Sequence, residues 1–301
     1  MSESSSSGPS DDQSRAPVGW IGIGKMGTPM SHRLLSAGFP LQAFDVDVER
    51  VRSAGLIAAR SLPELVHSVQ IVVTMIPDDN ALEQLILGPA GLATELQRGQ
   101  ILMDMSTVSA FVSQRCAARL NEMGVGFVRA PVSGSTALAA AGKLTIMSSG
   151  PQDAIARCRP LFSAMGEKCF IVGEADEARY LKLLINLMVG ASAAMLAEAL
   201  VFGEKGGLDW SVMLDVVGQS VVASPLIGYK LEPLKKRDFS PAFSGKQMLK
   251  DMTLVTKTAE GSGLNLPLTE LVRQTFQSMQ ESGHSDLDFF ALVKVLEEKL
   301  L

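Results

Sequence analysis

The sequence has little of the basic charge that a nucleic-acid-binding protein needs. Its 301 residues carry 27 Lys and Arg against 32 Asp and Glu, which gives a formal net charge of −5 and a pI near 5.4. Contact with phosphate backbones requires a face rich in lysine and arginine, and no dense basic block occurs along the chain. We therefore expect no nucleic-acid partner and favour a small-molecule one.

Cysteine and histidine are scarce as well. The three cysteines, at positions 116, 158 and 169, have no C-x-x-C spacing and are odd in number, so we expect reduced thiols and a cytoplasmic location. The three histidines, at positions 32, 67 and 284, belong to no Cys/His/Asp metal spacing, and no G-x-S-x-G motif is present. The sequence therefore predicts no metal site, and it lends little support to histidine acid/base chemistry.

Long uncharged apolar runs are also missing. Spanning a bilayer takes roughly 18 apolar residues, and Lys182 and Glu198 interrupt the longest such run. The first fifteen residues are rich in serine and include three acidic residues, whereas a signal peptide has an apolar core and a transit peptide avoids acidic residues. We expect residues 1–15 to be a disordered tail on a soluble protein without membrane contact.

What the sequence does have is a regular alternation of short apolar runs and amphipathic segments up to about residue 172. Continuously apolar strands separated by helices are typical of a parallel sheet covered on both faces. Beyond residue 173 the pattern becomes helical, beginning with one long segment over 176–206. We expect an α/β Rossmann-type doubly wound domain over 16–175 and an all-α substrate and dimerisation domain over 176–301. The predicted strands are 18–23, 41–44, 71–76, 101–105, 126–130, 144–147 and 169–172, and the predicted helices between them are 27–37, 80–87, 109–123 and 153–165.

A glycine-rich turn follows the first predicted strand and opens a predicted helix. In a G-x-G-x-x-G motif the glycines permit a tight turn, close approach of backbone N–H groups to a pyrophosphate and close helix packing, and the helix N-terminus favours the anion. A purely structural glycine turn is the alternative, but the strand–turn–helix context favours dinucleotide binding. The motif consists of Gly22, Ile23, Gly24, Lys25, Met26 and Gly27.

The second predicted strand ends on Asp45, a position that bears on the choice between NAD and NADP. A carboxylate there can accept hydrogen bonds from the adenosine ribose hydroxyls and would repel a 2′-phosphate. The next arginine is Arg50, so we favour NAD and keep NADP open. In the alternative reading Asp45 caps the following helix, and Arg50, one turn inside it, still reaches a phosphate.

Lys182 and Asn186 are spaced four residues apart in the long helical segment, so they share one face of it. The neighbouring positions are almost all apolar, and such a helix is expected to be buried, where a lysine costs free energy unless it is paired. A lysine whose side chain simply reaches solvent is the plain alternative. With the phosphate turn upstream and no competent histidine, we favour Lys182 as the proton-transfer residue.

Four segments in this order resemble the β-hydroxyacid dehydrogenase family, whose type member is 3-hydroxyisobutyrate dehydrogenase. Together they extend over nearly the whole chain after the tail, and as a set they are far more specific than the glycine turn alone. They are the run Gly22 to Met30, the run Asp104-Met105-Ser106-Thr107, the run Ala130-Pro131-Val132-Ser133-Gly134-Ser135, and the pair Lys182 and Asn186.

The resemblance implies hydride transfer between a nicotinamide and a small β- or ω-hydroxyacid or its semialdehyde, with Lys182 as acid/base and Asn186 orienting the reacting group. It implies that Lys250 closes over the nicotinamide from the second domain. The substrate carboxylate is then expected at Ser133, Gly134 and Ser135, and the cofactor beside Ile76, Pro77 and Thr107. Family members usually form homodimers or homotetramers through the helical domain, where Gly190, Ala191, Ala193, Ala194 and Ala197 offer a small-residue face.

Within the family the chain is most similar to the branch that reduces glyoxylate and succinic semialdehyde. That likeness rests on Pro241-Ala242-Phe243, Lys250-Asp251 and the Asp286 to Phe289 run, and it implies that Phe243 and Asp251 line the substrate site. Ser135 and Thr136 depart from common family residues, which puts the substrate's identity in doubt. An imine reductase, in which the lysine is commonly replaced, and a catalytically silent cofactor-binding scaffold remain the alternatives.

Overall fold

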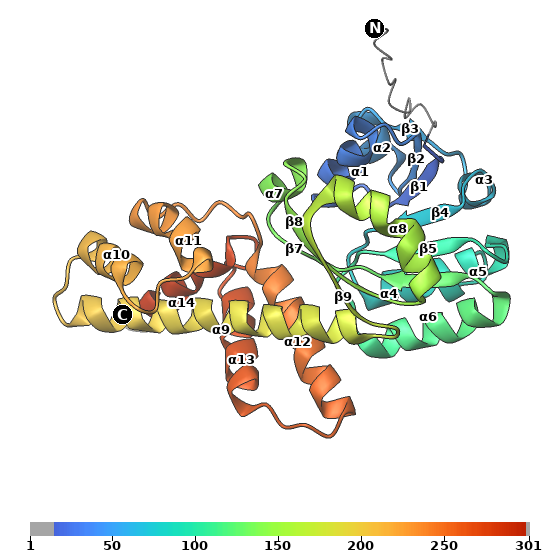
Figure 1. Cartoon of the computed structure of the whole chain (residues 1–301). Coiled ribbons are helices and arrows are strands. Elements are labelled where there is room, and N and C mark those ends of the chain that lie inside the picture. Colours follow the sequence, from blue (N-terminus) through green and yellow to red (C-terminus); the bar gives the residue numbers. More distant parts are fainter. Residues whose placement is uncertain (1–14, 299–301) are drawn as a thin grey trace, which may run out of the picture.

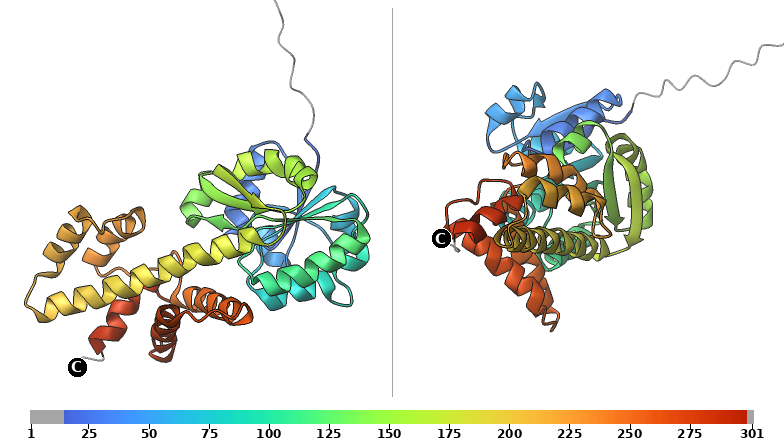
Figure 2. Two further views of the ribbon diagram at one scale, coloured as in Figure 1. Left: turned by 60° about the horizontal axis from the view of Figure 1, so that its bottom comes forward. Right: turned by 90° about the vertical axis from the view of Figure 1, so that its left-hand side faces the viewer.

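The computed structural model describes residues 15–298, so nearly all of the predicted tail lies outside the described residues. The chain forms two lobes, a sheet-containing lobe and a helical lobe, and the long helix α9 (Glu177–Lys205) runs from one into the other (Figure 1). Viewed from a second direction, the remaining C-terminal helices lie along α9 from its middle to its far end (Figure 2). This arrangement puts α9 at the junction of the two lobes.

The N-terminal lobe is built on one nine-stranded sheet in the order β3-β2-β1-β4-β5-β6-β8-β7, with β9 pairing to β8. The chain order reverses between β1 and β4, and ligands of open α/β sheets bind at such a reversal, beyond the carboxyl ends of the strands. The strands are β1 (Val18–Ile21), β2 (Leu41–Phe44), β3 (Ile57–Ala58), β4 (Ile71–Thr74), β5 (Ile101–Asp104), β6 (Gly126–Arg129), β7 (Val132–Ser133), β8 (Leu144–Ser149) and β9 (Gly166–Gly173).

The expectation of a parallel sheet holds from β3 to β6 and is wrong beyond that point. Strand β8 runs antiparallel to both β6 and β7, while β8 and β9 are parallel to each other. Only ten residues separate β7 from β8, and their one helix is the short α7 (Thr136–Ala140). A parallel crossover needs a dozen or more residues, so the chain turns back instead. The two-residue strands β3 and β7 were not predicted from the sequence either.

Helices cover both faces of the sheet because side chains alternate along each strand. On β5, for example, Ile101 and Met103 belong to one core cluster and Leu102 belongs to the other. The first cluster is completed by α1 (Gly27–Ser36) and α8 (Gln152–Met165). The second is completed by α3 (Leu62–His67), α4 (Asp79–Leu87), α5 (Leu92–Glu95) and α6 (Ala110–Met123).

The helical lobe has a core of its own that begins at Leu183 on α9. Helices α12, α13 and α14 contact α9 directly, and α10 and α11 pack on each other near its C-terminal half. Their bounds are α10 (Trp210–Gln219), α11 (Pro225–Lys235), α12 (Gly245–Gly261), α13 (Pro267–Glu281) and α14 (Leu292–Glu298). The expected all-α character is therefore found throughout the described part of this lobe.

Helix α9 is not buried on all sides, contrary to expectation. The small residues predicted as an open packing face lie mostly inside the lobe, where Gly190, Ala193, Ala194 and Ala197 are buried. Large apolar residues occupy the open face instead, namely Tyr180, Leu184, Met188, Met195 and Phe202, which we call the α9 stripe. By length and composition alone α9 would be long enough to cross a membrane. Its other face packs against α12 and α14, as expected of a core helix.

Two buried ion pairs fasten the first turn of α9 to the sheet. The Arg179 guanidinium, fully buried, donates to Asp104 Oδ2 at the end of β5 and to the Ser106 carbonyl at 2.8 Å. Beside it, Arg129 Nε donates to Asp176 Oδ1 at 3.1 Å. Each charge in this cluster has an opposite partner, as a buried charge requires. The direction in which α9 leaves the sheet is therefore set by β5 and β6.

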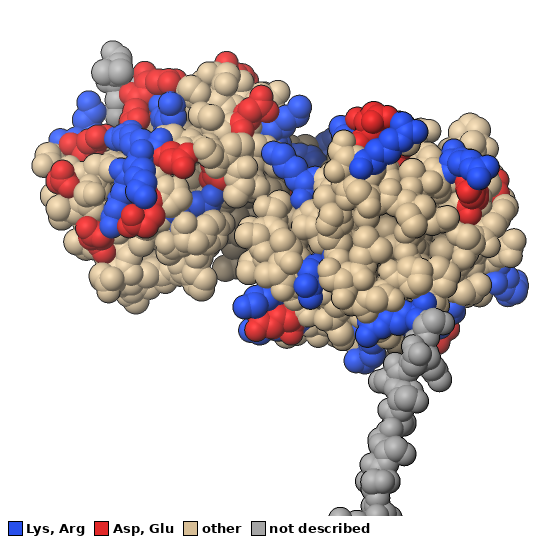
Figure 3. Space-filling view, turned by 90° about the horizontal axis from the view of Figure 1, so that it is seen from above, with Lys and Arg blue, Asp and Glu red and all other residues tan. Residues whose placement is uncertain are grey.

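Acidic and basic side chains are mixed over both lobes on the face seen in Figure 3, where a narrower waist joins the lobes. Neither sign of charge gathers into one large patch on that face. Such a surface offers no extended basic footprint of the kind that nucleic acids require.

Candidate functional site

The three glycines of the phosphate turn have different surroundings, and the lack of a side chain has a different consequence at each of them. Gly22 has φ +98°, and a Cβ there would lie 2.2 Å from the Met75 carbonyl oxygen. A Cβ on Gly27 would lie 2.0 Å from the Gly22 oxygen, so only glycine lets α1 start this close to β1. Around Gly24 nothing lies within 4 Å of an added Cβ, which leaves that side of the turn open to a ligand.

Helix α1 begins at this turn without a side-chain cap, since its N-cap residue is Met26. In contrast, α2 (Val48–Ser53), α3 and α4 are capped by Asp47, Ser61 and Asp78. Uncapped N–H groups at a helix start bind phosphate well. Together with the open side at Gly24, the start of α1 fits the pyrophosphate of a dinucleotide.

Asp45 stands against the same turn. Its Oδ2 accepts a 2.8 Å hydrogen bond from the Ile23 amide and its Oδ1 accepts one of 2.9 Å from the Asp47 amide. The alternative in which Asp45 caps the next helix is wrong, because Asp47 is the residue that caps α2. Arg50 lies on the first turn of α2, 3.9 Å from Asp45, and is more than half exposed. A carboxylate and a guanidinium therefore both border the expected ribose position.

The ends of β4 and β5 are tied to the helical lobe by Lys250 of α12. Its Nζ donates to the Pro77 carbonyl at 3.1 Å and to the Thr107 carbonyl at 2.9 Å. Ser106 supports the same pair of loops from below, because its hydroxyl accepts from the Ile76 amide at 2.9 Å and donates to Asp104 at 2.6 Å. The structure thus brings together four residues expected at the cofactor, namely Ile76, Pro77, Thr107 and Lys250.

Asn186 is held by a carboxylate from α12. Its Nδ2 donates to Asp251 Oδ2 at 2.6 Å, and both side chains are buried. The close approach of α9 and α12 depends on Gly190, one turn further along, where a Cβ would come within 2.9 Å of the Met252 sulfur. Asp251 was expected to line the substrate site; its contacts here are with Asn186, which it orients, and with Lys250 Nζ at 3.0 Å.

Lys182 is half-buried one turn before Asn186 and one turn after Arg179. Desolvation lowers its pKa from the ordinary 10.5; nearby Lys250 lowers it further, and Asp251 raises it in opposition. Within residues 15–298 no hydrogen bond or ion pair engages its ammonium. Lys182 is therefore a lysine that loses its proton more easily than an exposed lysine does, and its Nζ is available to a ligand.

The expected substrate loop follows β7. Gly134 has φ +142°, and a Cβ there would lie 2.7 Å from Leu144, so only glycine fits. Ser135 is used as the N-cap of α7, where its hydroxyl accepts from the Leu138 amide. Phe243 packs edge-on to Phe289 at 5.8 Å in the helical core. In the described chain no hydrogen bond joins Ser133, Ser135 or Phe243 to Lys182, so their grouping as one site stays a prediction.

Sequence reasoning gave no role to Arg179, Asp104 or Ser106, which connect the cofactor loops to the lysine helix. Asp104 and Ser106 stood inside a quoted motif, and Arg179 was a charged residue in an apolar segment, the same signal that singled out Lys182. Among the described residues, no group of three or more His, Cys, Asp or Glu side chains could hold a metal ion.

The comparisons with known proteins agree with this geometry. Residues 17–173 match the family described as the NAD binding domain of 6-phosphogluconate dehydrogenase. Residues 177–296 match the family described as the NAD-binding domain of NADP-dependent 3-hydroxyisobutyrate dehydrogenase. The chain belongs to the β-hydroxyacid dehydrogenase family. It is an NAD(P)-dependent oxidoreductase with a Rossmann-type domain followed by a helical domain, as the sequence resemblance predicted.

Individual relatives cover almost the whole chain. The NAD-dependent L-serine dehydrogenase of Pseudomonas aeruginosa is 31% identical over 93% of this chain and 97% of its own. The 2-(hydroxymethyl)glutarate dehydrogenase of Eubacterium barkeri is 32% identical over 93% and 95%. The solved 3-hydroxyisobutyrate dehydrogenase of Mycobacterium tuberculosis with L-serine has a TM-score of 0.85 at 27% identity, covering 94% of this chain and 99% of that one.

The lowered pKa of Lys182 predicts how substitution of this residue changes the melting temperature of the protein. Because the charged lysine costs more in the folded than in the unfolded chain, Lys182→Met should raise the melting temperature at pH 7. The gain should shrink as the pH rises from the folded pKa towards 10.5, since the wild-type lysine then loses its proton in both states. The difference in melting temperature between Lys182→Met and wild type is measured by thermal unfolding across this pH range. Lys143→Met, at an exposed lysine, is the control. A lower melting temperature for Lys182→Met at pH 7 would contradict the burial argument.

Proposed function

We propose that the protein transfers hydride between a nicotinamide and a small β- or ω-hydroxyacid or its semialdehyde, with Lys182 as general acid and base. The observation that carries the proposal is the position of Lys182, on one helix face with Asn186 and beside the α12 residues that hold the cofactor loops. The family supports the reaction class. The assignment of Lys182 rests on our own argument from geometry and charge.

The chemistry follows from the lowered pKa of Lys182, because a lysine that loses its proton more easily can serve as a base. A bound nicotinamide would accept a hydride from the hydroxyl-bearing carbon in oxidation and supply one to the carbonyl carbon in reduction. In the oxidation direction neutral Lys182 takes the hydroxyl proton, and in the reduction direction the Lys182 ammonium gives a proton to the carbonyl oxygen. Asn186, fixed through Asp251, can direct its remaining amide oxygen at the reacting hydroxyl. We place the substrate carboxylate at Ser133, Gly134 and Ser135, with Phe243 bordering it. The retained lysine weighs against an imine reductase and against a silent scaffold.

Lys182→Ala tests the mechanism. General acid–base catalysis typically contributes about 10² to 10⁴-fold, so kcat should fall by that order while binding of the reduced cofactor, followed by fluorescence, stays near wild type. Initial rates are read as reduced-nicotinamide absorbance with 3-hydroxyisobutyrate, 3-hydroxypropionate, glyoxylate and succinic semialdehyde. Lys143→Met, which removes the charge of an exposed lysine, serves as the control. Equal turnover by Lys182→Ala and wild type would refute the role of Lys182.

We further propose NAD as the preferred cofactor, on the strength of the Asp45 carboxylate at the expected ribose position. The double variant Asp45→Asn with Val46→Arg replaces a repelling carboxylate by an amide and an added cation. The ratio of kcat/KM with NADP to kcat/KM with NAD should rise at least tenfold. Asp47→Asn, which alters a neighbouring carboxylate at the helix cap, is the control. If the ratio does not move in the double variant, Asp45 does not decide the choice.

We also propose a cytoplasmic homodimer, with the α9 stripe as the interface. An exposed row of large apolar side chains is unusual on a monomer, and two copies of one helix face can cover each other about a twofold axis. Phe202, 82% exposed, is the most open member of the stripe.

Phe202→Glu should therefore lower the molar mass in sedimentation or light scattering from that of a dimer, or a tetramer, to that of a smaller species. Phe111→Glu, at a phenylalanine that is 67% exposed on α6, is the control and should leave the mass unchanged. An unchanged mass for Phe202→Glu, or a monomeric wild type, would rule out the stripe as the interface.

A further inference from the structure

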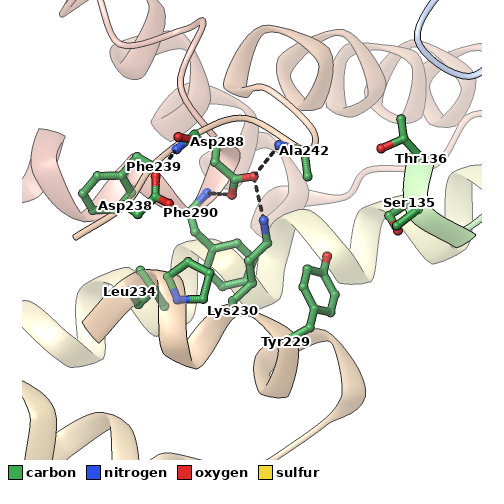
Figure 4. Close-up of a pocket in the computed structure, with 13 residues that line it drawn as sticks. Ser135, Thr136, Tyr229, Lys230, Leu234, Asp238, Phe239, Ala242, Asp288 and Phe290 are labelled. Atoms are coloured by element: carbon green, nitrogen blue, oxygen red, sulfur yellow. Dashed lines mark hydrogen bonds and ion pairs between the residues drawn. The ribbon is translucent and has the colours of Figure 1, made fainter. Parts of the chain in front are cut away.

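A cavity of about 230 Å³ lies between the two lobes, next to the expected substrate loop (Figure 4). One wall is formed by Ser135 and Thr136 at the start of α7, and the other by α11 and the segment that leads into α12. Two lining residues, Ser135 and Ala242, are the direct neighbours of Gly134 and Phe243. The cavity therefore begins where the expected carboxylate site ends.

Hydroxyl groups line the entrance of this cavity. The Tyr229 phenol from α11 points to the side on which Ser135 and Thr136 stand (Figure 4). Tyr229 is more than half exposed, but partial desolvation raises its pKa and Asp288 raises it further, so the phenol keeps its proton and can donate a hydrogen bond. Ser240 contributes another hydroxyl to the lining. These side chains can donate to or accept from an uncharged polar ligand.

The floor of the cavity contains a buried but neutralised charge. Lys230 Nζ lies 2.6 Å from Asp288 Oδ2, and both side chains are less than 8% exposed. Asp288 is fully engaged, because the amides of Ala242 and Phe290 also donate to it. At the rim the exposed Asp238 adds a negative charge, since hydrogen bonds from Ser240 hold its pKa below the usual range.

This balance of charges decides what the cavity can accept. The Lys230 and Asp288 charges cancel, and the remaining charged side chain of the lining is the negative Asp238. A second carboxylate placed here would lose its hydration without gaining an unpaired cation. Apolar side chains complete the lining, among them Leu234 and Phe290, which suit methylene groups. At ~30 Å³ for each water, the volume also exceeds what a three-carbon acid needs beyond its reacting end.

We propose that this cavity receives the tail of the substrate, remote from the reacting carbon, and selects an uncharged, hydroxyl-bearing tail over a carboxylate tail. The inference rests on the proposed function, because it takes the carboxylate and the reacting hydroxyl to lie at Ser133 and Lys182. Tyr229 and Thr136 are then the residues that set specificity, and the Lys230–Asp288 pair fixes the shape of the floor.

Three acids with the same reacting half test the selection. Each is a 3-hydroxypropionate that carries a tail on carbon 2, and the tails are 3-hydroxypropyl, its near-isostere butyl, and the 2-carboxyethyl group of 2-(hydroxymethyl)glutarate. A neutral hydrogen bond contributes about 0.5–1.5 kcal/mol, so kcat/KM should be about 3- to 10-fold higher for the hydroxyl tail than for butyl. The carboxylate tail should give the lowest value of the three.

Tyr229→Phe should bring the hydroxyl-to-butyl ratio of kcat/KM close to one. Tyr180→Phe alters the chain's other tyrosine, which lies outside the cavity, and should keep the wild-type ratio. If none of these acids is oxidised and none of 3-hydroxyisobutyrate, 3-hydroxypropionate, glyoxylate and succinic semialdehyde turns over, the proposed function itself fails. If 3-hydroxyisobutyrate turns over but the carboxylate tail is preferred, or Tyr229→Phe leaves the ratio intact, the cavity does not select the tail and the proposed function stands.

Discussion

The buried contact between Arg179 and Asp104 is the constraint on which the arrangement of the two lobes depends. It joins the last residue of β5 to the first turn of α9, and the same guanidinium also holds the carbonyl of Ser106. Ser106 in turn supports the β4 loop through the Ile76 amide. Removing one partner of such a buried pair typically costs about 3–5 kcal/mol. One cluster therefore fixes both the loops that face the cofactor and the helix that carries Lys182.

A second connection works from the other side of the junction. Lys250 reaches back to the carbonyls of Pro77 and Thr107, while the adjacent Asp251 reaches forward to Asn186. Two successive residues of α12 thus link the cofactor loops to the face of α9 that carries the lysine. The small side of α9 at Gly190 is what permits this approach. A bulkier residue there would meet the side chains of Met248 and Met252 on α12.

Much of this could be predicted from the sequence because it depends on local pattern. The strand–helix alternation predicted the Rossmann-type sheet, and the glycines of the phosphate turn indicated a backbone conformation that favours glycine. The antiparallel β8 was missed because strand direction depends on the length of the connection after β7, which the apolar pattern does not report. Arg179 was missed for a different reason: its partner Asp104 lies 75 residues away in the sequence, and no spacing rule connects such a pair. The exposed α9 stripe was missed because the sequence pattern of an apolar helix is the same whether the helix is covered by its own chain or by another copy.

Helix α9 carries three kinds of contact, and its faces explain why they do not interfere. Small residues face the helical core, the polar pair Lys182 and Asn186 faces the junction, and the α9 stripe faces outward. The stripe contains Tyr180 and Leu184, each two positions from Lys182 and therefore on the opposite side of the helix. A second copy that covered the stripe would leave the face that carries Lys182 and Asn186 open towards the junction of the lobes. Association and proton transfer would then use separate faces of a single helix.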